Sequence, residues 1–144
     1  MRAVVTRVSS ASVTIDGAVE GAIEQGFLVL LGVGPDDTEA VCDKLAEKIC
    51  NLRVFEDENG KMNRSLEQVE GALLVVSQFT LYADTSSRRP GFSGAARPDL
   101  AIPLYERFMD KCRERGFVVE HGQFGADMKV TSVNDGPVTI LYEI

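Results

Sequence analysis

Two uninterrupted runs of apolar residues constrain this fold more than any other feature of the sequence. They read FLVLLGV at residues 27–33 and GALLVVSQFTLYA at residues 71–83. A strand with one face in water alternates apolar and polar residues, whereas a strand covered on both faces is apolar throughout. Both runs therefore predict strands that lie in the interior of the protein.

Two helical patterns accompany these strands. Apolar residues recur at helical spacing after residues 34–40, where Asp36, Asp37 or Thr38 is suited to cap a helix. A second helix is predicted from residue 98 or 99 up to Gly116, with Pro103 placing the start of its regular part at about residue 102.

Further strands are predicted at 2–8, 11–17, 54–57, 117–122, 127–133 and 137–144. There is no internal repeat and no interdomain linker, so residues 1–144 are expected to form a single domain. Many strands with two main helices predict a mixed α/β (α+β) fold. We expect largely antiparallel sheets in a barrel-like or layered β/β/α arrangement.

The net charge of −7 argues against a broad basic face for nucleic acid. The positive charge is nevertheless uneven. Arg88, Arg89 and Arg97 lie in a Gly/Ser/Pro-rich segment, 86–98, that contains no acidic residue. This segment is either a solvated loop or a loop that contacts phosphate.

Three cysteines, Cys42, Cys50 and Cys112, are odd in number and far apart in the chain. This arrangement fits free thiols in a reducing compartment. The N-terminus has no apolar region typical of a signal peptide, and no run approaches the ~18 apolar residues of a membrane span. We therefore expect a cytoplasmic protein with no membrane partner.

The single histidine, His121, limits the chemistry that can be expected. A Cys/His zinc site needs clustered ligands, and none are spaced for one. The glycine motifs that bind nucleotide phosphates, GxGxxG and GxxxxGK[ST], are absent. A Ser-His-Asp triad would have to recruit His121. We expect no metal and no cofactor.

Polar residues inside the second apolar run mark a candidate site. Ser77, Gln78 and Thr80 interrupt it, and an unpaired buried polar group costs about 1–3 kcal/mol. These residues therefore either form local hydrogen bonds or line a functional site. Near the C-terminus, Asn134-Asp135-Gly136 before Pro137 predicts, on local grounds, a tight turn into a last strand.

Two segments together resemble the signature motifs of the D-aminoacyl-tRNA deacylases, namely SQFTLYAD at 77–84 and NDGPVT at 134–139. The resemblance covers the whole chain, with further landmarks in the expected order: ASVTIDG, GFLVLLGV (26–33), GKMN (60–63), RPGFS (89–93) and FGADM (124–128). It implies an editing hydrolase that cleaves the ester of D-aminoacyl-tRNA. It also implies removal of glycine misattached to alanine tRNA and rejection of L-aminoacyl-tRNA.

The resemblance further implies a homodimer that binds the acceptor end of aminoacyl-tRNA. Each active site would pair the Ser77–Thr80 segment of one subunit with Gly136-Pro137 of the other. The Gly136-Pro137 bond is then expected to be cis and to project into the pocket of the neighbour. The residues implied to bind substrate are Gly136, Pro137, Arg7, which braces the Gly-Pro carbonyls, Phe124 and Met128.

The catalytic residues implied by the resemblance are Ser77, Gln78, Phe79 and Thr80. Backbone N–H groups of Phe79 and Thr80 would stabilise the oxyanion, and the 2′-hydroxyl of the terminal adenosine would assist the attacking water. Ser77 and Gln78 would position the adenosine and the ester. The rival enzyme is an esterase of small esters with Thr80 as nucleophile, although a threonine without a nearby base is a poor nucleophile. A non-catalytic RNA-binding dimer is a third alternative.

Overall fold

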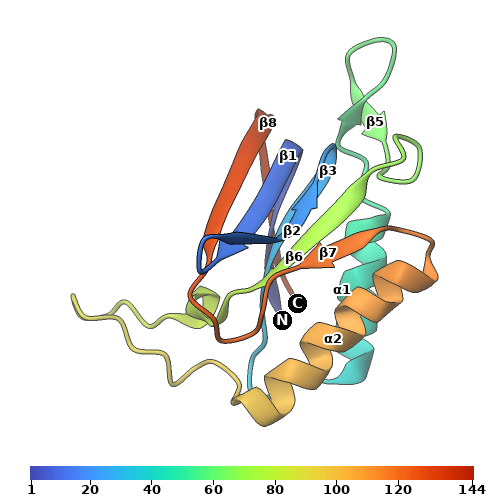
Figure 1. Cartoon of the computed structure of the whole chain (residues 1–144). Coiled ribbons are helices and arrows are strands. Elements are labelled where there is room, and N and C mark those ends of the chain that lie inside the picture. The colour runs from blue at the N-terminus through green and yellow to red at the C-terminus, as the bar shows by residue number, and fades with distance from the viewer.

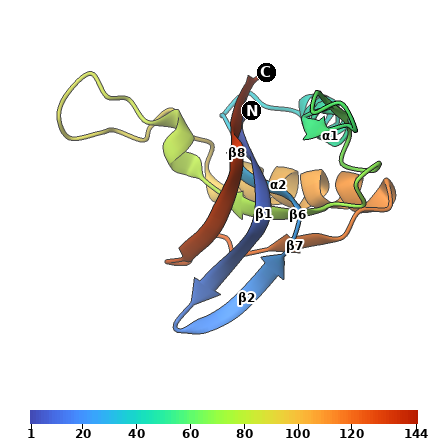
Figure 2. The same ribbon diagram turned by 90° about the horizontal axis from the view of Figure 1, so that it is seen from above.

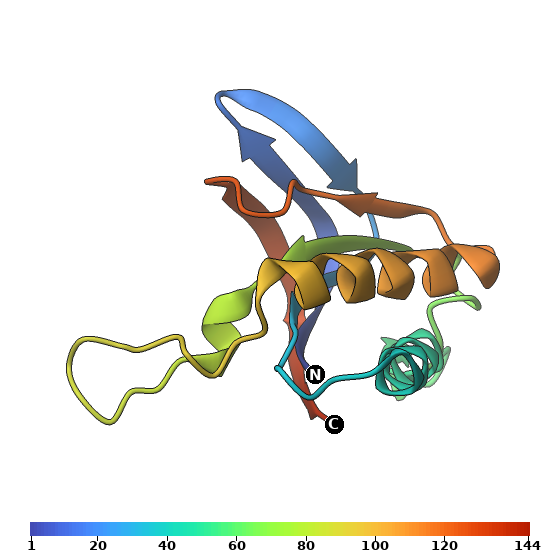
Figure 3. The ribbon, with the colours of Figure 1, turned by 90° about the horizontal axis from the view of Figure 1, so that it is seen from below.

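The structure, a computed structural model that describes residues 1–144, has a six-stranded sheet with both helices on one face (Figures 1 and 3). The sheet contains β1 (Arg2–Ile15), β2 (Ala18–Ile23), β3 (Gly26–Gly32), β6 (Ala72–Ser77), β7 (Val119–His121) and β8 (Lys129–Glu143). The helices are α1 (Glu39–Cys50) and α2 (Pro98–Glu114). A separate small hairpin is formed by β4 (Phe55–Glu56) and β5 (Met62–Arg64).

The strand order is β2-β1-β3-β6-β7, and β8 pairs with the other edge of β1. β1 is antiparallel to β2, β3 and β8, whereas β3, β6 and β7 run parallel. The sheet curls so far that β2 and β7, at the two ends of this order, lie against each other. Their closeness is shown at Gly21 of β2, where an added Cβ atom would lie 2.8 Å from the His121 carbonyl oxygen of β7. The predicted mixed fold with two main helices and a barrel-like sheet is confirmed.

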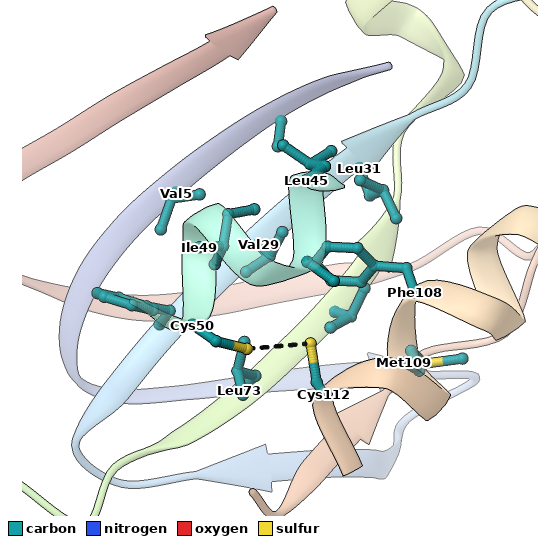
Figure 4. Packing of buried hydrophobic residues seen from close by; sticks show 14 of the residues in the cluster. Val5, Val29, Leu31, Leu45, Ile49, Cys50, Leu73, Phe108, Met109 and Cys112 are labelled. Atoms are coloured by element: carbon teal, nitrogen blue, oxygen red, sulfur yellow. Dashed lines mark hydrogen bonds between the residues drawn. The ribbon is translucent and has the colours of Figure 1, made fainter. Parts of the chain in front are cut away.

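The first apolar run is covered on both faces, as predicted, and so is the part of the second run that forms β6, whereas its residues beyond Ser77 are partly or fully exposed. Along β3, Phe27, Val29 and Leu31 point toward the helices, and Leu28 between them points into the curl of the sheet. The helix-side core joins these residues to α1 and α2 through Leu45, Ile49 and Phe108, which Figure 4 shows packed against the strands. Sequence periodicity and packing therefore agree along this strand.

β1 is one strand where the sequence predicts two, at 2–8 and 11–17. Ser9 and Ser10 break the apolar pattern and are exposed, but they stay in the strand because β8 continues to pair along this edge of β1. β1 ends at Ile15, and Asp16-Gly17, whose φ angles are 50° and 80°, form a tight two-residue turn into β2.

β8 is also one strand, where the sequence predicts two strands joined by a tight turn at Asn134-Asp135-Gly136. Its ladder with β1 resumes on both sides of this segment, and residues 135–138 form a bulge opposite Arg7. The Val138 N–H donates to the Asn134 side chain (3.1 Å) within the bulge. The predicted turn is wrong, because the chain bulges without reversing its direction.

β6 ends at Ser77, well before the predicted end of the second apolar run at residue 83. Its neighbour β3 ends at Gly32, and the last contact between the two is the bond from the Gln78 N–H to the Leu31 carbonyl (2.8 Å). Without a partner strand beyond this point, the chain winds into a 3₁₀-helix, η1 (Phe79–Tyr82).

Both helices begin at one of the predicted positions. The Thr38 hydroxyl caps α1 by accepting the Val41 N–H (3.3 Å). α2 starts at Pro98, the first-turn position that suits proline, so the delayed start at residue 102 is wrong and Pro103 lies inside the helix. Gly116 follows the end of α2 with a φ of 94°, as the predicted stop requires.

All three cysteines are buried free thiols, and Cys50 and Cys112 join α1 to α2 with their sulfur atoms 3.7 Å apart (Figure 4). Burial raises the pKa of the Cys42 thiol to about 12, so this thiol stays protonated and unreactive at neutral pH. The termini lie side by side, with the Met1 ammonium group 2.8 Å from the carbonyl oxygen of Ile144 (Figure 2). Neither helix combines the length and hydropathy that a membrane crossing requires.

Candidate active site

A cavity of about 830 Å³ lies where the end of β6, the loop before α2 and the segment between β7 and β8 converge. Its volume is typical of small-molecule sites, which span about 300–1,000 Å³. Five of the nine residues predicted for the site line it, namely Ser77, Gln78, Phe79, Phe124 and Met128. Residues from distant parts of the sequence thus meet at one concave surface.

Phe124 and Met128 are held in place by the body of the protein. The Phe124 ring lies 6.2 Å from the ring of Tyr105 in α2, whose hydroxyl donates to the Val75 carbonyl of β6 (2.9 Å). Met128 packs over Gly122, where any larger side chain would collide with the methionine sulfur. This wall of the cavity is therefore supported by α2 and by the end of β7.

The Ser77–Thr80 segment forms the opposite wall, at the change from β6 to η1. Ser77 and Gln78 are half-buried, whereas Phe79 is 55% exposed, and Thr80 does not line the cavity. The Gln78 side-chain amide donates a hydrogen bond to the Thr80 hydroxyl. Phe79 and Thr80 open η1, so their backbone N–H groups have no partner inside that helix. Such adjacent N–H groups are suited to bind an anionic oxygen.

No side chain that lines the cavity could serve as a general base. The lining contains no Asp, Glu, His, Cys, Lys or Tyr, and its one ionisable side chain is Arg97. His121 lies in a different hollow beside α2, with its Nδ1 atom 2.5 Å from the Gly122 carbonyl oxygen. Ser77 and His121 therefore do not share a site, and the structure offers no Ser-His-Asp arrangement around Ser77.

Gly136 and Pro137 lie in the β8 bulge and do not line the cavity of their own chain. The peptide bond between them is cis, and Gly136 has a φ of 134°, which other residues rarely adopt. A Cβ atom at Gly136 would lie 2.9 Å from both the Arg7 Nη2 atom and the Val138 Cγ2 atom. The segment can follow this path only because Gly136 has no side chain.

Arg7 supports this bulge from β1. It is the one buried charged side chain, 6% exposed, and its Nε donates to the Asp135 carbonyl (2.9 Å) while Nη1 donates to the Val54 carbonyl (2.6 Å). The family resemblance implies that Arg7 braces the carbonyls of Gly136 and Pro137. In the structure Arg7 instead bonds to the carbonyl of the preceding residue, Asp135. The cause is the bulge, which places residues 135–138 opposite Arg7.

The third wall of the cavity comes from residues that the sequence did not single out for this role, above all Phe92 and Arg97. The Phe92 ring packs edge-on against Phe79 with ring centres 5.1 Å apart. The sequence feature that could have indicated this role is Phe92 itself, because an aromatic residue is unexpected in a Gly/Ser/Pro-rich loop that contacts only solvent. No group of three or more His, Cys, Asp or Glu side chains is arranged to hold a metal ion.

Comparison with known proteins identifies the family to which this arrangement belongs. A sequence profile of the D-Tyr-tRNA(Tyr) deacylases matches residues 4–143. A D-aminoacyl-tRNA deacylase of Shewanella baltica (strain OS195) is 58% identical over 145 residues, which cover 100% of both chains. One from Roseiflexus castenholzii (strain DSM 13941 / HLO8) is 60% identical over 99% of this chain and 92% of its own length.

Solved structures give the same result for the fold. The c-Myc DNA unwinding element binding protein superimposes with a TM-score of 0.94 at 41% identity, over 100% of this chain and 99% of its own. A probable eukaryotic D-amino acid tRNA deacylase has a TM-score of 0.87 at 18% identity, over 99% of this chain and 98% of its own. With the profile match over nearly all residues, and as the sequence motifs predicted, the chain belongs to the D-Tyr-tRNA(Tyr) deacylase family.

Proposed function

We propose that this protein hydrolyses the ester bond that joins a D-amino acid to the 3′ end of tRNA, in the cavity lined by Ser77, Gln78 and Phe79. The observation that carries the proposal is that two family landmarks, SQFT at 77–80 and FGADM at 124–128, meet at this cavity. The free, buried thiols fit a reducing compartment, so we place the activity in the cytoplasm, where aminoacyl-tRNA is used.

The paired deacylation of D-Tyr-tRNA and L-Tyr-tRNA under single-turnover conditions tests this function. We expect the D ester to be cleaved at least about 10²-fold faster, the scale of rejection that a shaped site achieves. Glycyl-tRNA(Ala) should be cleaved as well, since glycine has no side chain to exclude. Equal cleavage of D-tyrosyl ethyl ester and D-Tyr-tRNA would instead favour an esterase of small esters. Binding of tRNA without hydrolysis would favour a non-catalytic RNA-binding dimer.

Selection between D and L substrates requires a feature that occupies the space of an L side chain, and we assign it to the Gly136-Pro137 segment of a second subunit. Backbone carbonyls there would accept hydrogen bonds from the α-ammonium group of the substrate. An L side chain would then collide with main chain, whereas a D side chain points elsewhere and glycine has none. Backbone suits this role because it has no rotamers with which to move aside.

Two features of the monomer support such a homodimer. β8 pairs with β1 along one edge only, so its other edge presents unpaired N–H and C=O groups, a state that proteins normally cover. The same strand exposes apolar side chains, with Leu141 74% and Val133 55% exposed. Moreover, the Gly136-Pro137 segment does not line the cavity of its own chain, so a partner must supply it if it contacts substrate.

Co-expression of two inactive variants tests whether each site is shared between subunits. Gln78→Ala damages the cavity wall and Gly136→Ala damages the bulge. A mixed dimer of the two retains one undamaged site, so random pairing should restore about a quarter of the wild-type sites. Two lesions in the same segment, Ser77→Ala with Gln78→Ala, should restore none. If the first pair also restores no activity, the site is not shared.

The mechanism we propose takes the missing base from the substrate. Since no base lines the cavity, the 2′-hydroxyl of the terminal adenosine would orient the attacking water and relay its proton to the 3′-oxygen, which leaves as the ester bond breaks. The N–H groups of Phe79 and Thr80 would stabilise the negative charge on the carbonyl oxygen of the tetrahedral intermediate. Ser77 and Gln78 would hold the adenosine and the ester.

A further inference from the structure

The arginine loop, residues 85–97, extends away from the body of the protein (Figures 1, 2 and 3). Residues of its second half, among them Phe92 and Arg97, line the cavity. The base of the loop is fixed by an antiparallel bridge between Asp84 and Gly91, with hydrogen bonds of 2.7 and 2.9 Å. A bond from the Ala96 N–H to the Val33 carbonyl (2.9 Å) anchors its other end to the body. The loop thus has a fixed base and a projecting tip.

The three arginines of this loop differ from all others in the chain. The remaining seven each hydrogen-bond or ion-pair with protein groups through their side chains: Arg2, Arg7, Arg53, Arg64, Arg107, Arg113 and Arg115. Arg88, Arg89 and Arg97 are exposed and make no such contact. The loop contains no acidic residue, although the protein as a whole has a net charge of −7.

Uncompensated guanidinium groups are suited to an external anion, and above all to phosphate, whose oxygens match their paired N–H donors. The position of the three arginines indicates which phosphates they would contact. Arg97 lines the cavity itself, whereas Arg88 and Arg89 lie on the projecting part of the loop beyond the Asp84–Gly91 bridge. The positive charge therefore continues from the cavity outward along one side.

We propose that Arg88, Arg89 and Arg97 bind the phosphodiester backbone of the single-stranded 3′ end of tRNA where it leaves the cavity. This inference rests on the proposed function, because an ester of tRNA seated in the cavity must have its RNA strand pass over this rim. The bases carry no part of the contact, so it holds any tRNA alike and supplies affinity without sequence preference. It also explains how an acidic protein retains a polyanionic substrate.

The test compares the triple variant R88Q/R89Q/R97Q with a matched control, R53Q/R64Q/R115Q, which removes the same charge at arginines that have protein partners. Binding of tRNA that carries no amino acid is measured over a range of salt concentrations. We expect the loop variant to raise Kd at least about tenfold at low salt. Because each phosphate contact on a single strand contributes about 0.7 to the salt slope, three lost contacts should reduce it by about 2.

A second measurement removes the phosphates instead of the arginines. Single-turnover hydrolysis is compared for D-Tyr-tRNA and for the D-tyrosyl ester of adenosine, and the loop variant should lose about tenfold more with the former. The variant R88K/R89K/R97K, which keeps the positive charge of the loop, should retain most of the salt slope of tRNA binding. Equal losses with both substrates, an unchanged slope, or an equal loss in the control variant would overturn the proposal.

The two proposals fail in different ways. A wild-type protein that binds tRNA through the loop but cleaves D and L esters alike would refute the deacylase function and leave the phosphate contact standing. A selective deacylase whose loop variant binds tRNA as tightly as the wild type would do the reverse. Binding of tRNA that carries no amino acid separates the two proposals, since this binding does not depend on catalysis.

Discussion

Removal of the 2′-hydroxyl from the terminal adenosine of D-Tyr-tRNA is expected to lower the single-turnover rate by about 10²–10⁴-fold, the usual contribution of general acid–base assistance. The reason is the composition of the cavity wall, which contains no carboxylate, imidazole, thiol, amine or phenol. The 2′-hydroxyl is the substrate group adjacent to the ester oxygen. Without it, no group near the ester is available to accept a proton from the attacking water.

Thr80→Ala is expected to retain most of the activity. Thr80 does not line the cavity, and its hydroxyl oxygen accepts a hydrogen bond from the Gln78 amide, a group that cannot remove its proton. Loss of one neutral hydrogen bond is worth about 1 kcal/mol, so the rate should fall by no more than about three- to tenfold. A covalent nucleophile would instead lose nearly all activity on substitution.

The two changes together discriminate between the mechanisms. A 2′-deoxy nucleotide at the penultimate position is the matched control, because it alters the RNA without touching the ester, and its rate should equal that of unmodified tRNA. If the terminal 2′-deoxy substrate reacts normally while Thr80→Ala abolishes cleavage, Thr80 is the nucleophile. In that case the wild-type protein, quenched early in the reaction, should carry an acyl group of the expected added mass, and Thr80→Ala should carry none.

Local patterns predicted the elements whose cause is local. The helix cap at Thr38 and the stop at Gly116 depend on residues within a few positions, and both occur as expected. The two-faced burial of β3 also follows from its own apolar content. Each of these features needs only the side chain and its near neighbours in sequence.

The predictions that failed depend on partners far away in the chain. Ser9 and Ser10 remain in β1 because β8 lies alongside them, and β6 stops because β3 supplies no partner beyond its end. The contact of Arg7 with the Asp135 carbonyl follows from the register of the same β1–β8 pair. A single sequence does not specify such pairings, so these details had to come from the structure.

The cavity shows the same division. Motif resemblance located Ser77, Gln78, Phe124 and Met128, which line it. The contribution of the arginine loop could not be assigned, because its path depends on the tertiary bond from Ala96 to the Val33 carbonyl. Whether the wall is complete in one subunit is likewise a property of assembly and not of local sequence.

Gly136→Ala is expected to lower the deacylation of D-Tyr-tRNA by about 10²-fold or more, the cost of moving a reacting group by about 1 Å. The φ of 134° is unfavourable for alanine, and its Cβ atom would approach Arg7 Nη2 and Val138 Cγ2 to 2.9 Å. Arg7 has little freedom to yield, since it is 6% exposed and also holds the Val54 carbonyl. The bulge must therefore shift, and the Gly136 and Pro137 carbonyls shift with it.

Gly17→Ala separates this local displacement from a general loss of stability. Gly17 also has a positive φ, 80°, but no atom lies within 4 Å of a Cβ built there, and it follows the end of β1, whereas the bulge faces Arg7 in the first half of that strand. Both variants should lose about 1–3 kcal/mol of stability from backbone strain, measured by denaturant unfolding. Only Gly136→Ala should lose activity. Equal activity in the two variants would show that the position of this main chain is irrelevant to catalysis, and selection of the D ester would then have to be sought within the cavity of a single subunit.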